Sequence, residues 1–159
     1  MKNFIGLSAV LTGFNKSIIA PNIDPVDIKT TYLEEFNSKV ESKLDTEILS
    51  NYAFLEKEDK SDQEIGEAML DSSNGEDFVM ACRSLIFLWY SGAWPTIIPA
   101  TVDQPASTIS SLVSSKSYTA GLVWQVMQAH PMGDSNYQYG YWAEPPVDLD
   151  KYTGNPETN

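Results

Sequence analysis

The chain has little of what disulfides, metal sites and nucleic-acid surfaces require. Among its 159 residues there is one cysteine, Cys82, and one histidine, His130. A single cysteine cannot form an internal disulfide, and the common zinc sites need several Cys or His ligands at short spacing. Only 10 Lys and Arg stand against 22 Asp and Glu, a formal net charge of −12. We therefore expect no metal site, no nucleic-acid partner and no attraction to anionic lipid, because the last two require clustered basic side chains.

Long apolar runs are also absent. No stretch reaches the roughly 18 apolar residues that a membrane-spanning helix needs, so we expect no direct membrane insertion. The stretch from Met1 to Phe14 combines one early positive charge with a short apolar run, and it faintly resembles a secretory signal. No twin arginine and no good cleavage site accompany it. We interpret this stretch as a structural first helix.

Motifs for catalysis are missing as well. Neither G-x-G-x-x-G nor G-x-x-x-x-G-K-[ST] occurs, so no standard nucleotide or dinucleotide site is expected. No nucleophile elbow accompanies His130, which we interpret as a cap for helix carbonyls or a contact to a partner rather than as a base. Cys82 lies inside an apolar run, where cysteine is usually an inert small hydrophobe. We expect neither catalytic residues nor a bound cofactor in this chain.

What the chain does contain is helical periodicity. Apolar residues recur at spacings of three and four, and Asp24-Pro25 is a good helix start. The run from 75 to 90 is apolar nearly all round, Ser73-x-x-Glu76 before it has the form of a capping box, and Gly92 is a natural stop after it. Residues 102–117 are rich in Ser and Thr and are expected to form a loop, with one helical turn at 109–113. Helices are expected over residues 4–14, 25–44, 46–55, 62–70, 75–90 and 117–129. The sequence thus predicts an all-α fold of five to six helices without a sheet.

Aromatic residues gather in the second half of the chain. All four tryptophans and five of the eight tyrosines fall within 78–146. Several stand in expected loops rather than at core helical spacing, and Trp and Tyr are favoured at protein interfaces. We predict that they bind a partner protein; the alternative is that they fold back over the two apolar helices. The expected partner-binding residues are Trp94, Pro95, His130, Tyr139, Tyr141, Trp142, Pro145 and Pro146.

The domain organisation follows from the same pattern. Residues 1–146 are expected to form a single helical domain that ends in an extended, irregular segment rich in aromatic residues and proline. Residues 147–159 are expected to be a polar tail.

Four segments carry a family resemblance through their order and spacing. They are Leu7–Phe14 (LSAVLTGF), Leu88–Pro95 (LWYSGAWP), Tyr118–Gly133 (YTAGLVWQVMQAHPMG) and Gly140–Pro146 (GYWAEPP). Together they resemble the small subunit of membrane-associated FAD-dependent sugar and alcohol dehydrogenases, of the sorbitol, fructose and glucose dehydrogenase type. The similarity spans about residues 5–146.

The resemblance implies an accessory role. In such complexes FAD and substrate belong to a large subunit of the glucose–methanol–choline oxidoreductase type, and a cytochrome subunit often takes the electrons. The small subunit supports folding and stability of the large one, and it typically carries a twin-arginine export signal. A periplasmic location is implied if such a signal has been removed, and a cytoplasmic one otherwise. From the residues alone, a free-standing helical protein that encloses a small hydrophobic ligand stays open as an alternative function.

Overall fold

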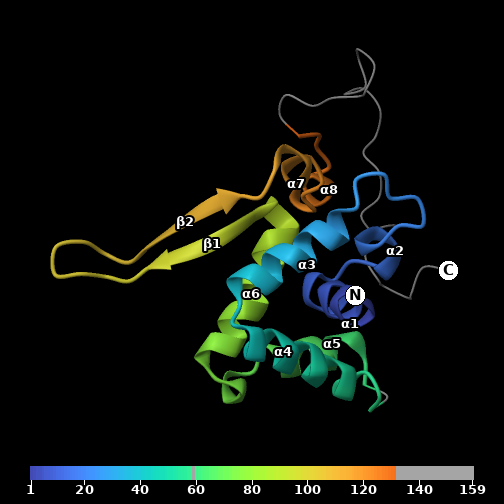
Figure 1. The fold of residues 1–159 in the computed structure, drawn as a ribbon, viewed down its shortest axis with the longest axis horizontal. Helices are drawn as coiled ribbons and strands as arrows, with labels where there is room; N and C mark the ends of the chain where they lie inside the picture. The colour runs from blue at the N-terminus through green and yellow to red at the C-terminus, as the bar shows by residue number, and fades with distance from the viewer. Residues whose placement is uncertain (59, 132–159) are drawn as a thin grey trace.

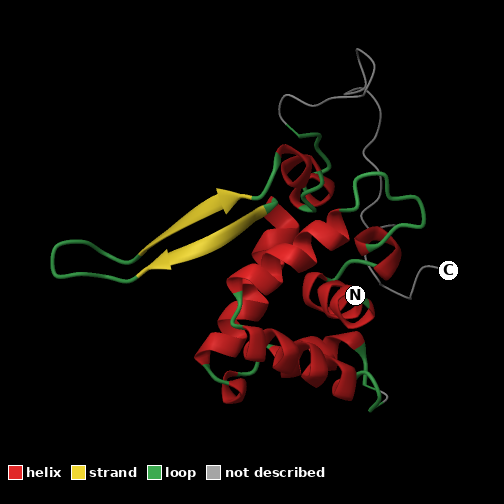
Figure 2. Ribbon diagram, viewed as in Figure 1, coloured by secondary structure: helices red, strands yellow, loops and turns green. Residues whose placement is uncertain are grey.

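A computed structural model describes residues 1–58 and 60–131, in which helices pack around one apolar core and a β-hairpin projects from them (Figure 1, Figure 2). The elements in chain order are α1 (Lys2–Thr12), α2 (Lys16–Ile19), α3 (Ile28–Lys39), α4 (Ser42–Leu55), α5 (Asp62–Met69), the 3₁₀-helix η1 (Ser72–Asn74), α6 (Glu76–Ser91), β1 (Ala93–Ile98), β2 (Ser107–Leu112), α7 (Ser115–Thr119) and α8 (Val123–Val126).

Helix α1 lies at the centre of the bundle, where it contacts α2, α4, α5 and α6. Its apolar side chains Phe4 and Leu7 are fully buried. Gly6 allows α4 to approach closely, because a Cβ at this position would collide with the hydroxyl of Tyr52. The helix ends at Gly13, whose φ of 75° is left-handed. Residues 2–12 therefore form a structural helix, as their periodicity predicts.

The helix predicted over residues 25–44 is in fact two helices, α3 and α4. The break falls at Val40, whose backbone is extended with φ −97° and ψ 140°. Val40 is nevertheless buried like the apolar residues before it, so the periodicity continues through the break. The start of α3 is also later than predicted, because Asp27 before it adopts a left-handed φ of 52°.

Helix α6 joins three parts of the core through its aromatic side chain Trp89. The indole N–H donates to the hydroxyl of Ser8 in α1 at 2.9 Å. The edge of its ring meets Tyr32 of α3 at a centroid distance of 4.7 Å. The Tyr32 hydroxyl in turn donates to the carbonyl oxygen of Ser117 in α7 at 3.2 Å. Residues far apart in the sequence thus meet around one buried tryptophan.

The ends of α6 differ in how well the sequence predicts them. The left-handed stop at Gly92 is confirmed, with φ 72°. The prediction of a capping box at its start is wrong, because Ser73 lies within η1 and Gly75 is the residue that precedes the helix. A capping box of this kind instead begins α5, where Ser61 and Glu64 bind each other's backbone N–H groups.

The prediction of an all-α fold of five to six helices without a sheet is wrong. Strands β1 and β2 pair antiparallel, in register from Ala93 opposite Leu112 to Ile98 opposite Ser107. The hairpin stands away from the helices (Figure 1). Its outer residues are therefore exposed on both faces, and they show no alternation of apolar and polar residues that would predict strands. The helical turn expected at 109–113 is the end of β2.

The helix expected from 117 to 129 is also wrong, since the structure has two short helices, α7 and α8. The chain between them passes Gly121, where a Cβ would approach the backbone carbonyl of Tyr90 to 2.8 Å. At this point the chain packs closely against the end of α6, and the helix does not continue through it.

Candidate protein-binding surface

Both ends of the hairpin are fixed at one point on the helical body. The carbonyl oxygen of Gly92 accepts hydrogen bonds from the backbone N–H of Val113 at 3.1 Å and from the hydroxyl of Ser117 at 2.8 Å. A Cβ at Gly92 would collide with the Ser117 backbone carbonyl. The left-handed φ and this close approach together require glycine. We call Gly92, Val113 and Ser117 the junction.

Three of the four segments that carry the family resemblance meet at the junction or beside it. The Tyr90 hydroxyl donates to the carbonyl of Thr12 at 3.0 Å, which joins the second segment to the first. The Leu122 N–H donates to the carbonyl of Trp89 at 3.0 Å, which joins the third to the second. The fourth segment, Gly140–Pro146, lies outside the described residues. The first three segments therefore contribute to the base from which the hairpin projects.

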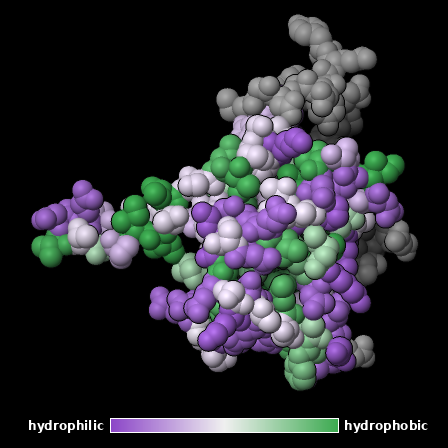
Figure 3. All heavy atoms as spheres, viewed as in Figure 1, coloured by the Kyte–Doolittle hydropathy of each residue, from purple (hydrophilic) through white to green (hydrophobic). Residues whose placement is uncertain are grey.

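The projecting hairpin, residues 93–112, forms what we call the arm. Its exposed apolar side chains include Ile97 at 49%, Ile98 at 41%, Ile109 at 55% and, at the base, Leu112 at 52%. The register places Ile98 and Ile109 on one face, and Ile97 and Leu112 on the other. Hydrophobic surface on the arm is visible beyond the body in Figure 3. Neither face of the outer arm is covered by the described part of the chain.

Charge is distributed unevenly between the arm and the helices. Segment 34–77, which contains α4 and α5, holds 14 acidic and 4 basic residues, a formal net charge of −10. Segment 78–131 holds one acidic and two basic residues, a net charge of +1, and the only charged residue of the arm is Asp103. Exposed apolar side chains on an extension with few charges are typical of protein-binding surfaces.

The sequence-predicted site residues fall into three places. Trp94 lies at the base of the arm, only 8% exposed, with its ring against Phe36 at a centroid distance of 6.4 Å. Pro95 follows it in β1 and is half-buried. His130 follows α8, with its ring Nδ1 2.9 Å from the carbonyl oxygen of Pro131. The remaining predicted residues, Tyr139, Tyr141, Trp142, Pro145 and Pro146, lie outside the described residues.

The isoleucines of the arm are the surface residues that sequence reasoning missed. Ile97 and Ile98 precede Pro99, and Ile109 follows Pro105. Two β-branched stretches on either side of a proline-containing loop are a hairpin signal, although loops of this length are less specific than two-residue turns.

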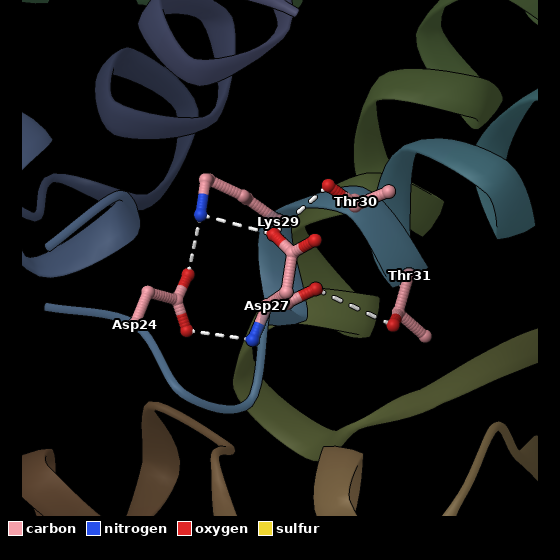
Figure 4. A network of polar contacts seen from close by, with 5 residues as sticks. All are labelled: Asp24, Asp27, Lys29, Thr30 and Thr31. Carbon is pink, nitrogen blue, oxygen red and sulfur yellow. Dashed lines mark hydrogen bonds and ion pairs between the residues drawn. The ribbon is translucent and has the colours of Figure 1, made fainter.

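A polar cluster at the start of α3 is the clearest grouping of ionisable side chains (Figure 4). The Lys29 ammonium lies 2.6 Å from a carboxylate oxygen of Asp24 and 3.0 Å from one of Asp27. Its hydrogen bonds lower the pKa of both carboxyls, and they raise the pKa of Lys29 itself. Because lysine occupies the space between the carboxylates, the cluster holds the helix start in place and offers neither a base nor a metal site.

Two further observations concern the reactive side chains in the described part of the chain. Cys82 is fully buried, and burial raises the pKa of its thiol to about 12, which keeps it protonated and unreactive. Among residues 1–58 and 60–131, no group of three or more His, Cys, Asp or Glu side chains is placed to hold a metal ion.

A surface hollow of about 1380 Å³ lies between α1, α2 and α5. Its walls carry the apolar side chains of Val10 and Phe14, but also the charged side chains of Lys16, Asp62 and Glu67. The hollow is open to solvent. Sites for small hydrophobic ligands are concave, mostly apolar and largely enclosed, so the hollow gives little support to a ligand-binding function.

Across the described residues, no helix has both the length and the apolar character needed to cross a bilayer. Comparisons of the chain with protein-family models, with curated proteins and with solved structures found no match.

Proposed function

We propose that this chain is a non-catalytic accessory subunit. It binds and stabilises the large subunit of an FAD-dependent oxidoreductase of the glucose–methanol–choline type that acts on a sugar or alcohol. The flavin, and a cytochrome that takes its electrons, belong to other chains of the complex. The observation that carries the proposal is the arm, an extension with uncharged strands and exposed apolar side chains on both faces.

The internal architecture supports a binding role. The helical body has its own apolar core, so the exposed isoleucines of the arm are not needed to complete it. Exposing these side chains to water does not stabilise the free chain, because each Å² of apolar surface stabilises a protein by about 25 cal/mol only when it is buried. Three of the four segments behind the resemblance lie at or beside the base of the arm, where they help to fix its position. The described motif segments and the exposed apolar side chains therefore lie at the same end of the molecule.

Co-expression with a flavoprotein large subunit from the same source tests the proposal. Each chain alone and the pair together would be run on size exclusion, with absorbance followed at the flavin band. A yellow complex that contains both chains is expected, together with a large subunit that is insoluble or inactive alone. An obligate interface of this kind buries about 2,000 Å² or more.

The opposite result is equally clear. A colourless, stable monomer that leaves the solubility and activity of the flavoprotein unchanged would overturn the accessory role. Retention of a small apolar molecule in that monomer would favour the ligand-binding alternative.

A further inference from the structure

We propose that the arm holds the flavoprotein subunit by strand addition. The free edge of β2 pairs with an extended, uncharged strand of that subunit, rich in β-branched or aromatic residues. This inference rests on the proposed function and adds the mode of binding to it.

Strand β2 has an open edge. The described residues form a two-stranded sheet, so each strand has one edge without a partner strand. Proteins usually protect such edges with proline, charged side chains or covering elements. Strand β1 contains Pro95, which lacks a backbone N–H donor. Strand β2 has the sequence STISSL, with neither proline nor charge, and is therefore the edge that can accept another strand.

The hairpin is also incomplete as a sheet. An isolated pair of strands is marginally stable in water, and a third strand or a covering element is normally needed. Ile109 and Leu112 stand exposed on opposite faces of β2. A strand added at this edge would place its side chains beside both of them, because cross-strand and diagonal neighbours lie in contact distance.

The distribution of charge indicates which kind of strand fits the edge of β2. The only charged residue of the arm, Asp103, lies in the loop rather than on either strand. An uncharged strand therefore meets no charge that would have to be desolvated. A second copy of this chain fits poorly, because each copy has a net charge of −12, with −10 of it in segment 34–77. Bringing two such chains together costs electrostatic repulsion.

A matched pair of substitutions separates the edge from the faces of the arm. Ile109→Lys introduces a charge on β2, and Thr96→Lys introduces the same charge on β1. The two residues are directly opposite each other in the register and both are exposed, so the charges share one face. Circular dichroism and thermal unfolding of each free variant would establish that the helical body is unchanged.

Binding to the FAD-loaded large subunit would then be measured for each variant. If β2 accepts a strand, Ile109→Lys weakens binding by about tenfold or more, whereas Thr96→Lys changes it by about threefold or less. Amide hydrogen exchange in the wild-type complex would show new protection in residues 107–112.

Four outcomes would overturn the inference. Equal loss with both variants would mean that a face, not the edge, is covered, and no loss with either would mean that the arm is outside the interface; the accessory role survives both. Absence of any complex with the wild-type chain would overturn the accessory role and the arm proposal together. A dimer of the chain alone, dissociated by Ile109→Lys in light scattering, would replace the partner strand by a second copy.

Discussion

Gly92 combines two demands that only glycine meets at little cost. Its φ of 72° lies in the left-handed region, and a Cβ would collide with the carbonyl of Ser117. Gly13 has a similar φ of 75°, but a Cβ there has nothing within 4 Å. Glycine at position 92 is thus required for both conformation and space, whereas at position 13 it is required for conformation alone.

The two glycines give a direct prediction. Gly13→Ala should lower the free energy of unfolding by about 1 kcal/mol, the cost of a left-handed alanine. Gly92→Ala should lower it by about 3 kcal/mol, because the collision adds an overpacking cost of about 1–3 kcal/mol. Urea unfolding followed by circular dichroism would measure both values. Equal losses would mean that α7 moves away from Gly92 without cost.

At the scale of elements, the sequence predicts best where one face of a segment is buried. Helix α6 is predicted almost to its ends, because its apolar run is long and Gly92 stops it. The break at Val40 is not predictable, since that residue is buried whether the backbone is helical or extended. The arm is missed for the opposite reason: its outer strands bury neither face, and Ile109 and Leu112 even stand at helical spacing.

The candidate site is likewise only partly predictable from the sequence. The sequence predicts correctly that Trp94 and Pro95 stand in a non-helical segment, but it does not show that Trp94 packs on Phe36 at the base of the arm. That contact joins residues 58 positions apart and depends on the path of α3. The exposed isoleucines further out become apparent only once the pairing of β1 with β2 is known.

Stability and binding should be separable within the arm. Pairs of the hairpin alternate outward from the hydrogen-bonded pair Gly92–Val113, so Thr96 and Ile109 also form a hydrogen-bonded pair. Replacing residues 97–108 by Asn-Gly would join Thr96 to Ile109 through a two-residue turn that suits this pairing. The residues removed are exposed, so the melting temperature should change by about 2 °C or less, whereas flavoprotein binding should be lost.

Trp94→Ala is the control for the shortened arm. It removes a buried ring and should lower the free energy of unfolding by about 3–5 kcal/mol. Differential scanning calorimetry of both variants would give the comparison. A large fall in melting temperature on shortening the arm would show that the outer hairpin stabilises the fold.

At the scale of the whole molecule, the acidic segment 34–77 repels itself in the folded state. Its net charge of −10 is held within a few adjacent helices. Raising the salt concentration from 0.01 M to 0.15 M shortens the screening length from about 30 Å to about 8 Å. The melting temperature should therefore rise by a few degrees over this range.

A variant with less charge tests the cause of this salt effect. Glu34, Glu41 and Glu47 are all exposed, so the triple substitution by Gln leaves the core unchanged. The variant should melt higher than the wild type at low salt and respond less to added sodium chloride. An identical salt response in both proteins would assign the effect to something other than repulsion within this segment.

Because both strands of the arm meet the body at the carbonyl of Gly92, the arm can change length without moving any helix. Gain or loss of two cross-strand pairs at a time keeps every side chain on its original face. Related chains can therefore diverge in partner preference through insertions and deletions within 96–109, while selection on folding acts on the helices and the junction. In evolutionary terms, we expect insertions and deletions in related chains to fall in the hairpin rather than in the helices that carry it.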